Sequence, residues 1–118
     1  MLQRANRLRR SNDYRRVYSQ GRTVSGNYLI LKYRPGAASV PRIGVVVGSK
    51  VSKRAVVRNL IRRRLREILR LDVPLIPGII DIILTAKPQS KDSTYILLQQ
   101  EVHGLFRQVI QRNRRTVS

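Results

Sequence analysis

The stretch KVSKRAVVRNLIRRRLREILR, residues Lys50–Arg70, carries nine basic residues and a single acid, Glu67. Its apolar residues recur at helical spacing, which predicts an amphipathic helix over about residues 52–71 with one buried face. That face consists of Val57, Ile61, Leu65 and Ile68, with Leu60 and Leu69 beside it. A helix of this length must lie against another layer of the fold, so it anchors the prediction of the whole architecture.

The basic residues of this stretch are also periodic. Every fourth position is an arginine, at Arg54, Arg58, Arg62, Arg66 and Arg70. On a helix these side chains form one row, and like charges at this spacing repel by a few tenths of a kcal/mol per pair (about 0.2–0.5). A polyanion converts that repulsion into binding, because each phosphate contacted also releases counterions. A merely solvated helix face usually mixes signs, so the row favours nucleic acid.

Composition agrees with a polyanionic partner. The chain has 118 residues, predicting one domain over 1–118, and 42% of them are hydrophobic, enough for a compact core. Its formal net charge is +19 and its pI is about 11.8. Arginine, which pairs bidentately with phosphate, far outnumbers lysine. The absence of cysteine, of a secretory h-region and of a membrane-spanning apolar run leads us to expect a cytoplasmic protein without membrane contact.

The remaining pattern predicts an α-β-β-β-α-β-α order, an α+β sandwich with helices on a four-stranded sheet. We expect helices over 11–19, with Ser11 as N-cap, and over 92–111, and strands over 23–25, 28–34, 43–49 and 79–86. The short loop between the second and third strands favours an antiparallel hairpin. The near-continuous apolar run at 79–86 predicts a central strand. A basic arm over 1–10, extended or loosely ordered until bound, and a frayed basic tail over 112–118 complete the chain.

Catalytic residues are sparse. The six acids are scattered and form no metal-ligand cluster, and the single histidine, His103, is expected to be an ordinary helix residue rather than a base. Gly44 and Gly48 lie in a predicted strand, where close packing explains them better than phosphate binding. We therefore expect no catalytic residue and no protein metal site in this chain. An enzyme that contains it would need another component for the chemistry.

Tyrosines next to lysine offer a second candidate surface. Tyr14 and Tyr18 lie one turn apart on the first predicted helix, and Tyr28 and Lys32 share a face of the second strand. Aromatic rings stack on the bases of single-stranded RNA, and a neighbouring cation pairs with its phosphates. Tyrosines at helical spacing are more often core residues, so the residues alone leave both interpretations open.

Residues 53–67, KRAVVRNLIRRRLRE, resemble the signature helix of the bacterial ribonuclease P protein component. Further matches follow in the family's order: NRLRR at 6–10, DY at 13–14, VYSQG at 17–21, RIGV from 42, and AKP at 86–88. The resemblance spans from about Arg4 to Arg107. It implies a fold similar to the second domain of ribosomal protein S5, with a left-handed β-α-β crossover around the arginine helix.

The resemblance also implies a function. Such a protein is the small subunit of an endoribonuclease that removes the 5′ leader of precursor tRNA, with one protein expected per catalytic RNA. Hydrolysis is performed by the RNA subunit with Mg²⁺, which RNA and substrate hold, and the protein alone is not expected to cleave. RNA-subunit binding is implied for Lys53, Arg54, Arg58, Asn59, Arg62, Arg63 and Arg66. Leader binding is implied for Arg9, Tyr14, Tyr18, Tyr28, Lys32 and Lys87.

The largest departure from the family pattern is at Leu60. Leu60 stands where relatives commonly carry a cation, and Arg64, one turn further along, is expected to compensate. Two alternatives stay open. A ribosomal protein or general RNA chaperone would bind many RNAs without promoting tRNA processing. A DNA-binding regulator would insert the arginine helix into a major groove, but the helix has few base-reading amides and no helix-turn-helix spacing before it.

Overall fold

The computed structural model describes residues 4–36, 39–76 and 78–117, with the side chains of 75 and 113–117 excepted. Its main elements are α1 (Ser11–Gln20), β1 (Arg22–Ser25), β2 (Leu29–Pro35), β3 (Arg42–Val46), α2 (Ala55–Asp72), β4 (Ile80–Ala86) and α3 (Tyr95–Val117). Three short 3₁₀ turns, η1 (Arg4–Asn6), η2 (Val73–Leu75) and η3 (Pro88–Asp92), connect them. The predicted α-β-β-β-α-β-α order is confirmed.

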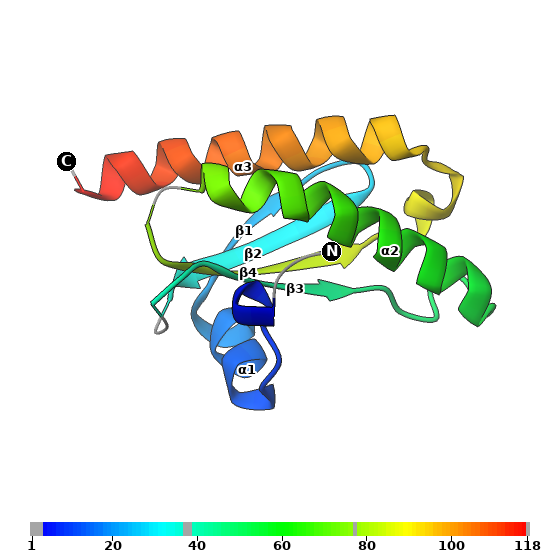
Figure 1. Cartoon of the computed structure of the whole chain (residues 1–118), viewed down its shortest axis with the longest axis horizontal. Helices are drawn as coiled ribbons and strands as arrows, with labels where there is room; N and C mark the ends of the chain where they lie inside the picture. Colours follow the sequence, from blue (N-terminus) through cyan, green and yellow to red (C-terminus); the bar gives the residue numbers. More distant parts are fainter. Residues whose placement is uncertain (1–3, 37–38, 77, 118) are drawn as a thin grey trace.

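The four strands form one sheet in the order β1-β2-β4-β3. Strand β2 pairs antiparallel with both β1 and β4, whereas β3 pairs parallel with β4. Helices α2 and α3 lie side by side on one face and α1 lies on the other (Figure 1). The chain therefore passes from β3 through α2 to reach its parallel neighbour β4, the crossover that parallel pairing requires.

The predicted hairpin between the second and third strands is wrong, because β4 lies between them. Asp81 of β4 is opposite Arg34 of β2 on one side and opposite Arg42 of β3 on the other. All residues of β4 are buried except the half-buried Thr85. The most apolar strand gains most from a central position, and this outweighs the short loop between β2 and β3. Strand β3 also ends at Val46 rather than at Ser49.

Successive side chains of each strand point to opposite faces of the sheet, and this places the apolar side chains in two separate clusters. Leu29, Leu31 and Tyr33 of β2 belong to the larger core under α2 and α3. The opposite face carries a much smaller cluster of Leu8, Val17 and Ile83, against which Tyr14 and Val46 pack. Most of the hydrophobic stabilisation therefore lies on the α2–α3 side, and α1 is held by few apolar contacts.

Helix α2 begins at Ala55, three residues after the predicted start, because the hydroxyl of Ser52 accepts the Arg54 N–H (3.1 Å) in a turn before the helix. Its buried residues include Ile61, Leu65, Ile68 and Leu69, while Val57 is half-buried. Helix α3 begins at Tyr95 rather than at Asp92, since residues 88–92 form η3. Helix α1 takes Arg10 as its N-cap, so Ser11 is its first residue and not the predicted cap.

The N-terminal arm, defined here as residues 4–10, is folded against the sheet rather than loosely ordered. Leu8 is buried, its N–H donates to the Ile43 carbonyl (2.9 Å), and Arg7 forms a parallel bridge with Ile43. The Asn6 amide donates to the Pro41 carbonyl (2.8 Å). The prediction failed because a single leucine among arginines carries no periodic signal. Residues 1–3 and the end of the predicted tail, Ser118, lie outside the described residues, and α3 continues through 112–117.

Candidate nucleic-acid interface

Helix α2 turns its arginine row away from the core. Arg58 donates to the Ser52 carbonyl (2.9 Å), and Arg62 donates to the Asn59 side chain (2.8 Å) and the Val47 carbonyl (3.3 Å). These acceptors are neutral, so they orient the guanidinium groups without cancelling their charge. Among the described residues, Arg70 is the only arginine of this row that forms an ion pair with a carboxylate, that of Glu67 (2.8 Å), and this hydrogen bond lowers the pKa of Glu67. The row keeps its positive potential, as predicted.

The acidic side chains of the molecule are mostly engaged elsewhere. Asp13 and Asp81 both bind Arg42, and Asp72 binds His103. The Glu101 carboxylate accepts the backbone N–H groups of Asn27 (2.7 Å) and Tyr28 (2.9 Å), which fastens the β1–β2 turn to α3. Few carboxylates are left to balance 25 lysines and arginines. The excess charge of +19 is therefore carried by the surface.

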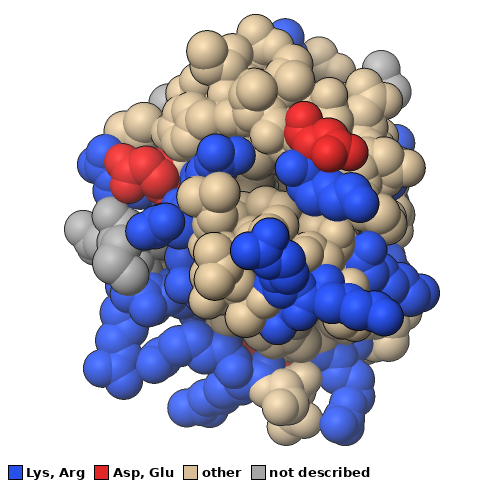
Figure 2. Space-filling view, turned by 90° about the vertical axis from the view of Figure 1, so that its right-hand side faces the viewer, with Lys and Arg blue, Asp and Glu red and all other residues tan. Residues whose placement is uncertain are grey.

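This surface is visible at the end of the molecule where α2 begins. Lysine and arginine side chains gather over the lower half of the face shown in Figure 2, while acidic side chains form two small, separate patches. The residues predicted to bind the RNA subunit lie together on α2 and the segment before it. Exposed members are Lys53, Arg54, Asn59 and Arg63, and half-buried members are Arg58, Arg62 and Arg66.

The departure at Leu60 is visible as an exposed apolar side chain, 36% accessible. Arg64, the expected compensating cation, is half-buried and donates to the Ser93 carbonyl (3.4 Å), just after η3 and before α3. This contact holds its head group on the α3 side of α2, whereas Arg62 contacts Val47 on the β3 side. Compensation by Arg64 stays a prediction.

On the opposite face of the sheet, α1 and β2 bring Tyr18 and Lys32 together. The Lys32 ammonium lies 5.7 Å from the centre of the Tyr18 ring, and it donates to the Tyr18 carbonyl (3.2 Å). The residue Tyr18 is 45% exposed. An accessible aromatic ring can stack on a base while the cation beside it pairs with the phosphate of the same nucleotide. Of the two interpretations open for this tyrosine, exposure favours binding.

Tyr14 has a different environment, because its ring lies against the backbone of β3 at Gly44. A Cβ on Gly44 would overlap the Tyr14 phenol, so the glycine is required by this close approach. Gly48 has open space around it, so close packing explains Gly44 but not Gly48. Burial raises the pKa of Tyr14; Tyr18 adds to this rise and the positive charge of Arg66 opposes it.

Three residues of the predicted leader set lie elsewhere. Tyr28 packs against the larger core, and its carbonyl accepts the Lys87 N–H (2.8 Å). The Lys87 ammonium donates to the Gly26 carbonyl (2.6 Å), so it supports the β1–β2 turn. Arg9 lies in the N-terminal arm. The structure therefore brings Tyr14, Tyr18 and Lys32 to one side of the sheet and pairs Tyr28 with Lys87 at the turn.

A group that sequence reasoning missed joins α1 to the sheet. Arg42 donates to both oxygens of Asp81 (3.0 and 2.9 Å) and to Asp13 (3.1 Å). The hydrogen bond to Asp81 contributes most to raising the pKa of Arg42, and the charge of Asp13 adds to it. The available signal was Asp81 itself, a carboxylate within an apolar strand, which requires a buried partner.

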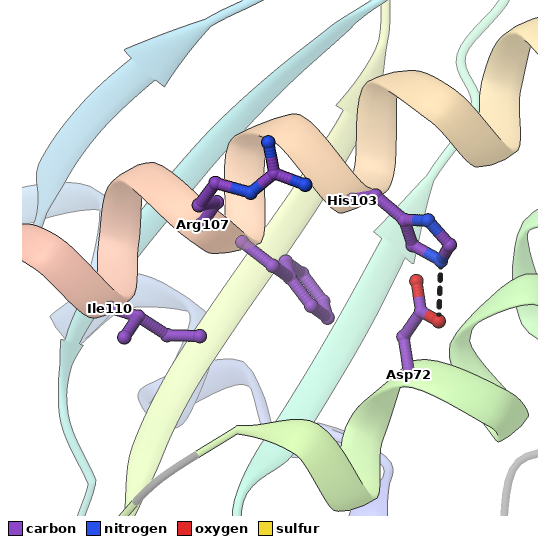
Figure 3. Close-up of a pocket in the computed structure, with 5 residues that line it drawn as sticks. Asp72, His103, Arg107 and Ile110 are labelled. Atoms are coloured by element: carbon purple, nitrogen blue, oxygen red, sulfur yellow. Dashed lines mark hydrogen bonds and ion pairs between the residues drawn. The ribbon is translucent and has the colours of Figure 1, made fainter.

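His103 lies on α3 and binds the buried Asp72 at the end of α2 (2.8 Å) (Figure 3). The imidazole is 46% exposed and borders a pocket of about 250 Å³ that Arg107 and Ile110 also line. The pair connects the two helices. No group of three or more potential metal ligands occurs among the described residues, and none of the helices described there is long and apolar enough to cross a membrane.

A cationic helix on one face of an α+β sheet, with an exposed tyrosine and a lysine on the other face, is typical of the nucleic-acid-binding class of proteins. Comparison with known proteins narrows this class, because a family model for ribonuclease P matches residues 2–110. The ribonuclease P protein component of Chloroflexus aurantiacus is 39% identical over 108 residues, covering 91% of this chain and 79% of the relative. That of a Cyanothece strain is 34% identical over 122 residues, covering 90% and 93%.

The fold gives the same result. The RNase P protein of Staphylococcus aureus superposes with a TM-score of 0.79 at 25% identity, covering 88% of this chain and 94% of that one. The predicted fold class and the family resemblance are thereby confirmed. The chain belongs to the ribonuclease P protein family.

Proposed function

We propose that this chain is the protein subunit of ribonuclease P and promotes removal of the 5′ leader from precursor tRNA in the cytoplasm. The observation that carries the proposal is the arginine row of α2 in a chain of this family, since from Arg54 to Arg66 the row forms no ion pair with a carboxylate of the described residues. The catalytic RNA binds this row, in a 1:1 complex. Mg²⁺ is held by RNA and substrate, and the protein contributes charge and geometry.

The leader binds the opposite face of the sheet, at Tyr14, Tyr18 and Lys32. The catalytic RNA and the leader are both polyanions, and they repel each other most strongly when little Mg²⁺ is present. A protein with cations on both sides of the edge strand β3 lowers this repulsion. It therefore raises the affinity for precursor over mature tRNA and reduces the Mg²⁺ required.

The test adds purified protein to a bacterial ribonuclease P RNA and precursor tRNA at low Mg²⁺, with leader release as the readout. Stimulation by the wild-type chain supports the proposal. A ribosomal protein or RNA chaperone would bind many RNAs with similar affinity and would leave the rate of leader release unchanged. Duplex DNA outcompeting structured RNA would instead favour a DNA-binding regulator.

Two substitutions separate the two surfaces. Arg58→Ala removes a cation from α2 and is expected to weaken assembly with the RNA subunit by about tenfold, while Tyr18→Ala is expected to raise the KM for precursor tRNA. Arg22→Ala, which removes one exposed cation from β1, is the charge-matched control. Equal effects of Arg58→Ala and Tyr18→Ala on both steps would contradict a two-surface arrangement.

A further inference from the structure

A pocket between the end of α2 and the middle of α3, here called the α2–α3 pocket, has no part in the proposed function. Its volume is about 250 Å³, and it is lined by Asp72, His103, Phe106, Arg107 and Ile110 (Figure 3). It lies on the face of the sheet that α2 and α3 cover, whereas α1 lies on the other face (Figure 1). Clefts that enclose a drug-sized ligand usually measure about 300–1,000 Å³, so this pocket has room for a single ring system.

Asp72 gives the α2–α3 pocket a hydrogen-bond acceptor that is not satisfied. Its side chain is 5% exposed, and its Oδ1 accepts a hydrogen bond from Nε2 of His103 (2.8 Å). No donor of the described residues reaches Oδ2, which is buried. A buried carboxylate oxygen without a donor is costly, because burial removes the water that would otherwise bind it. The pocket therefore favours a ligand that brings a hydrogen-bond donor to Asp72.

The other walls of the pocket determine which donor fits. Phe106 is buried and Ile110 is half-buried, and both present apolar surface. Arg107 is exposed, so it borders the solvent side of the pocket. Arg107 and the net charge of +19 repel a small cation such as an amine. A flat, uncharged ring with N–H groups suits both the apolar walls and the carboxylate, and Arg107 can pair with a phosphate attached to that ring.

Among the rings that carry phosphate in RNA, guanine meets these requirements best. Its Watson–Crick edge presents two neighbouring donors, N1–H and the N2 amino group, and a carboxylate accepts from both. Adenine and cytosine present one amino group next to a ring acceptor, and the N3–H of uracil lies between two carbonyl oxygens that a carboxylate repels. Proteins recognise unpaired bases in RNA in this way, through the base edge and through apolar or aromatic contact with the base face.

We propose that the α2–α3 pocket binds one unpaired guanine of the RNA subunit, with Asp72 accepting from the base edge and Arg107 pairing with the neighbouring phosphate. This inference rests on the proposed function. The RNA subunit is the partner chosen, because Asp72 is the last residue of α2, the helix that carries the arginine row, and the leader is assigned to the other face of the sheet. Phosphate contacts position an RNA, whereas contacts with base edges specify it. The guanine therefore fixes one register of the RNA subunit along α2.

The first experiment follows the imidazole signals of His103 by NMR while mononucleotides are added to the free protein at constant pH. His103 is the only histidine of the chain, so its signals are unambiguous. We expect saturable shifts, with guanosine monophosphate binding about tenfold more tightly than the adenosine, cytidine and uridine monophosphates of equal charge. Inosine monophosphate lacks the N2 amino group and should bind about fivefold more weakly than guanosine monophosphate. Equal affinities for these nucleotides, or unsaturable shifts, would overturn the site.

Three variants separate the base contact from the phosphate contact. Asp72→Asn keeps the size of the side chain but removes its charge, and it should abolish the preference for guanine. Asp92→Asn, which removes an exposed carboxylate of η3 outside the pocket, is the charge-matched control and should keep the preference. Arg107→Ala should weaken all the mononucleotides alike. A preference that survives Asp72→Asn would contradict the role of Asp72, and the comparison with inosine monophosphate tests the same contact on the wild-type protein should Asp72→Asn not fold.

The second experiment locates the guanine in the assembled complex with precursor tRNA, using kethoxal, which modifies unpaired guanines at N1 and N2. Wild type should protect one guanine of the RNA subunit that stays reactive with Asp72→Asn. Protection in the leader instead, or the same pattern with both proteins, would overturn the proposal. Failure of the proposed function is distinguishable, because the free protein would still select guanosine monophosphate although it would not stimulate leader release.

Discussion

The two faces of the sheet are stabilised in different ways. Helices α2 and α3 cover one face over a continuous apolar core that includes Leu65, Ile68 and Leu98, all fully buried. On the other face, α1 and the N-terminal arm rest on Leu8, Val17 and Ile83 and on the ion group centred on Arg42. The face under α2 and α3 supplies most of the hydrophobic stabilisation. The face under α1 has fewer apolar contacts and more exposed polar groups. The arginine row lies on the outer side of the stable layer, so its charge is presented by a rigid helix.

The largest expected effect tests the apolar layer. Leu65→Ala should destabilise the protein by about 2–5 kcal/mol, because a fully buried leucine of α2 leaves a cavity in the larger core. Urea denaturation followed by circular dichroism measures this loss. Leu60→Ala on the same helix, where the side chain is 36% exposed, is the matched control and should cost far less. Equal losses would show that the core does not dominate this face.

On the α1 face, Arg42→Met should destabilise by about 3 kcal/mol, because it leaves Asp81, 6% exposed, as a buried carboxylate without its cation. The same denaturation assay measures it. Adding Asp81→Asn removes the uncompensated charge, so the double variant should recover a large part of the loss. A double variant as unstable as Arg42→Met alone would show that Arg42 acts through packing and not through charge.

A smaller effect is expected at the contact between α1 and β3. Gly44→Ala forces Tyr14 away from the strand and should cost about 2 kcal/mol, and it should weaken binding of precursor tRNA. Combining it with Tyr14→Ala relieves the overlap. Gly48→Ala is the control, because a Cβ there meets no atom within 4 Å. If Gly48→Ala is as damaging, backbone freedom and not the Tyr14 contact explains both glycines.

The smallest effect is expected at the surface pair of Glu67 and Arg70, on the arginine row. A carboxylate whose pKa is lowered on folding stabilises the protein above its ordinary value of 4.5, and this contribution disappears as pH falls through the lowered pKa. Glu67→Gln should therefore lower the melting temperature slightly at pH 7 and leave it unchanged at strongly acidic pH. A difference that persists in acid would assign the effect to packing. The same variant should bind RNA slightly more tightly, because it removes a negative charge from the row.

Local patterns predicted the elements better than their arrangement. Helix α2 and strand β4 were predictable because each carries a long, consistent apolar pattern within its own residues. Strand pairing was not, since the short loop after β2 favoured β3 as its partner while burial of β4 determined the actual order. The strand order depends on which strand buries the most apolar surface at the centre of the sheet. This requires comparing all four strands, so the pattern of one strand alone does not predict its partners.

The site shows the same division. The arginine row on α2 followed from spacing, and each of its residues lies on that helix or the turn before it. The residues predicted to bind the leader lie in two separate places. Tyr28 and Lys87, 59 positions apart in sequence, are joined at the β1–β2 turn by the hydrogen bond from the Lys87 N–H to the Tyr28 carbonyl. The folding of the N-terminal arm was not predicted, because Leu8 is held by contacts with residues distant in sequence, whereas its arginine neighbours show no periodic pattern.

The packing of the N-terminal arm on β3 also protects an edge of the sheet against association with other chains. Strand β3 lies at one end of the sheet, where unpaired backbone groups could template association with another chain. Arg7 and Leu8 occupy part of that rim through their contacts with Ile43. A chain shortened to begin at Arg10 would expose it, and before RNA is available such a chain would be prone to edge-to-edge aggregation.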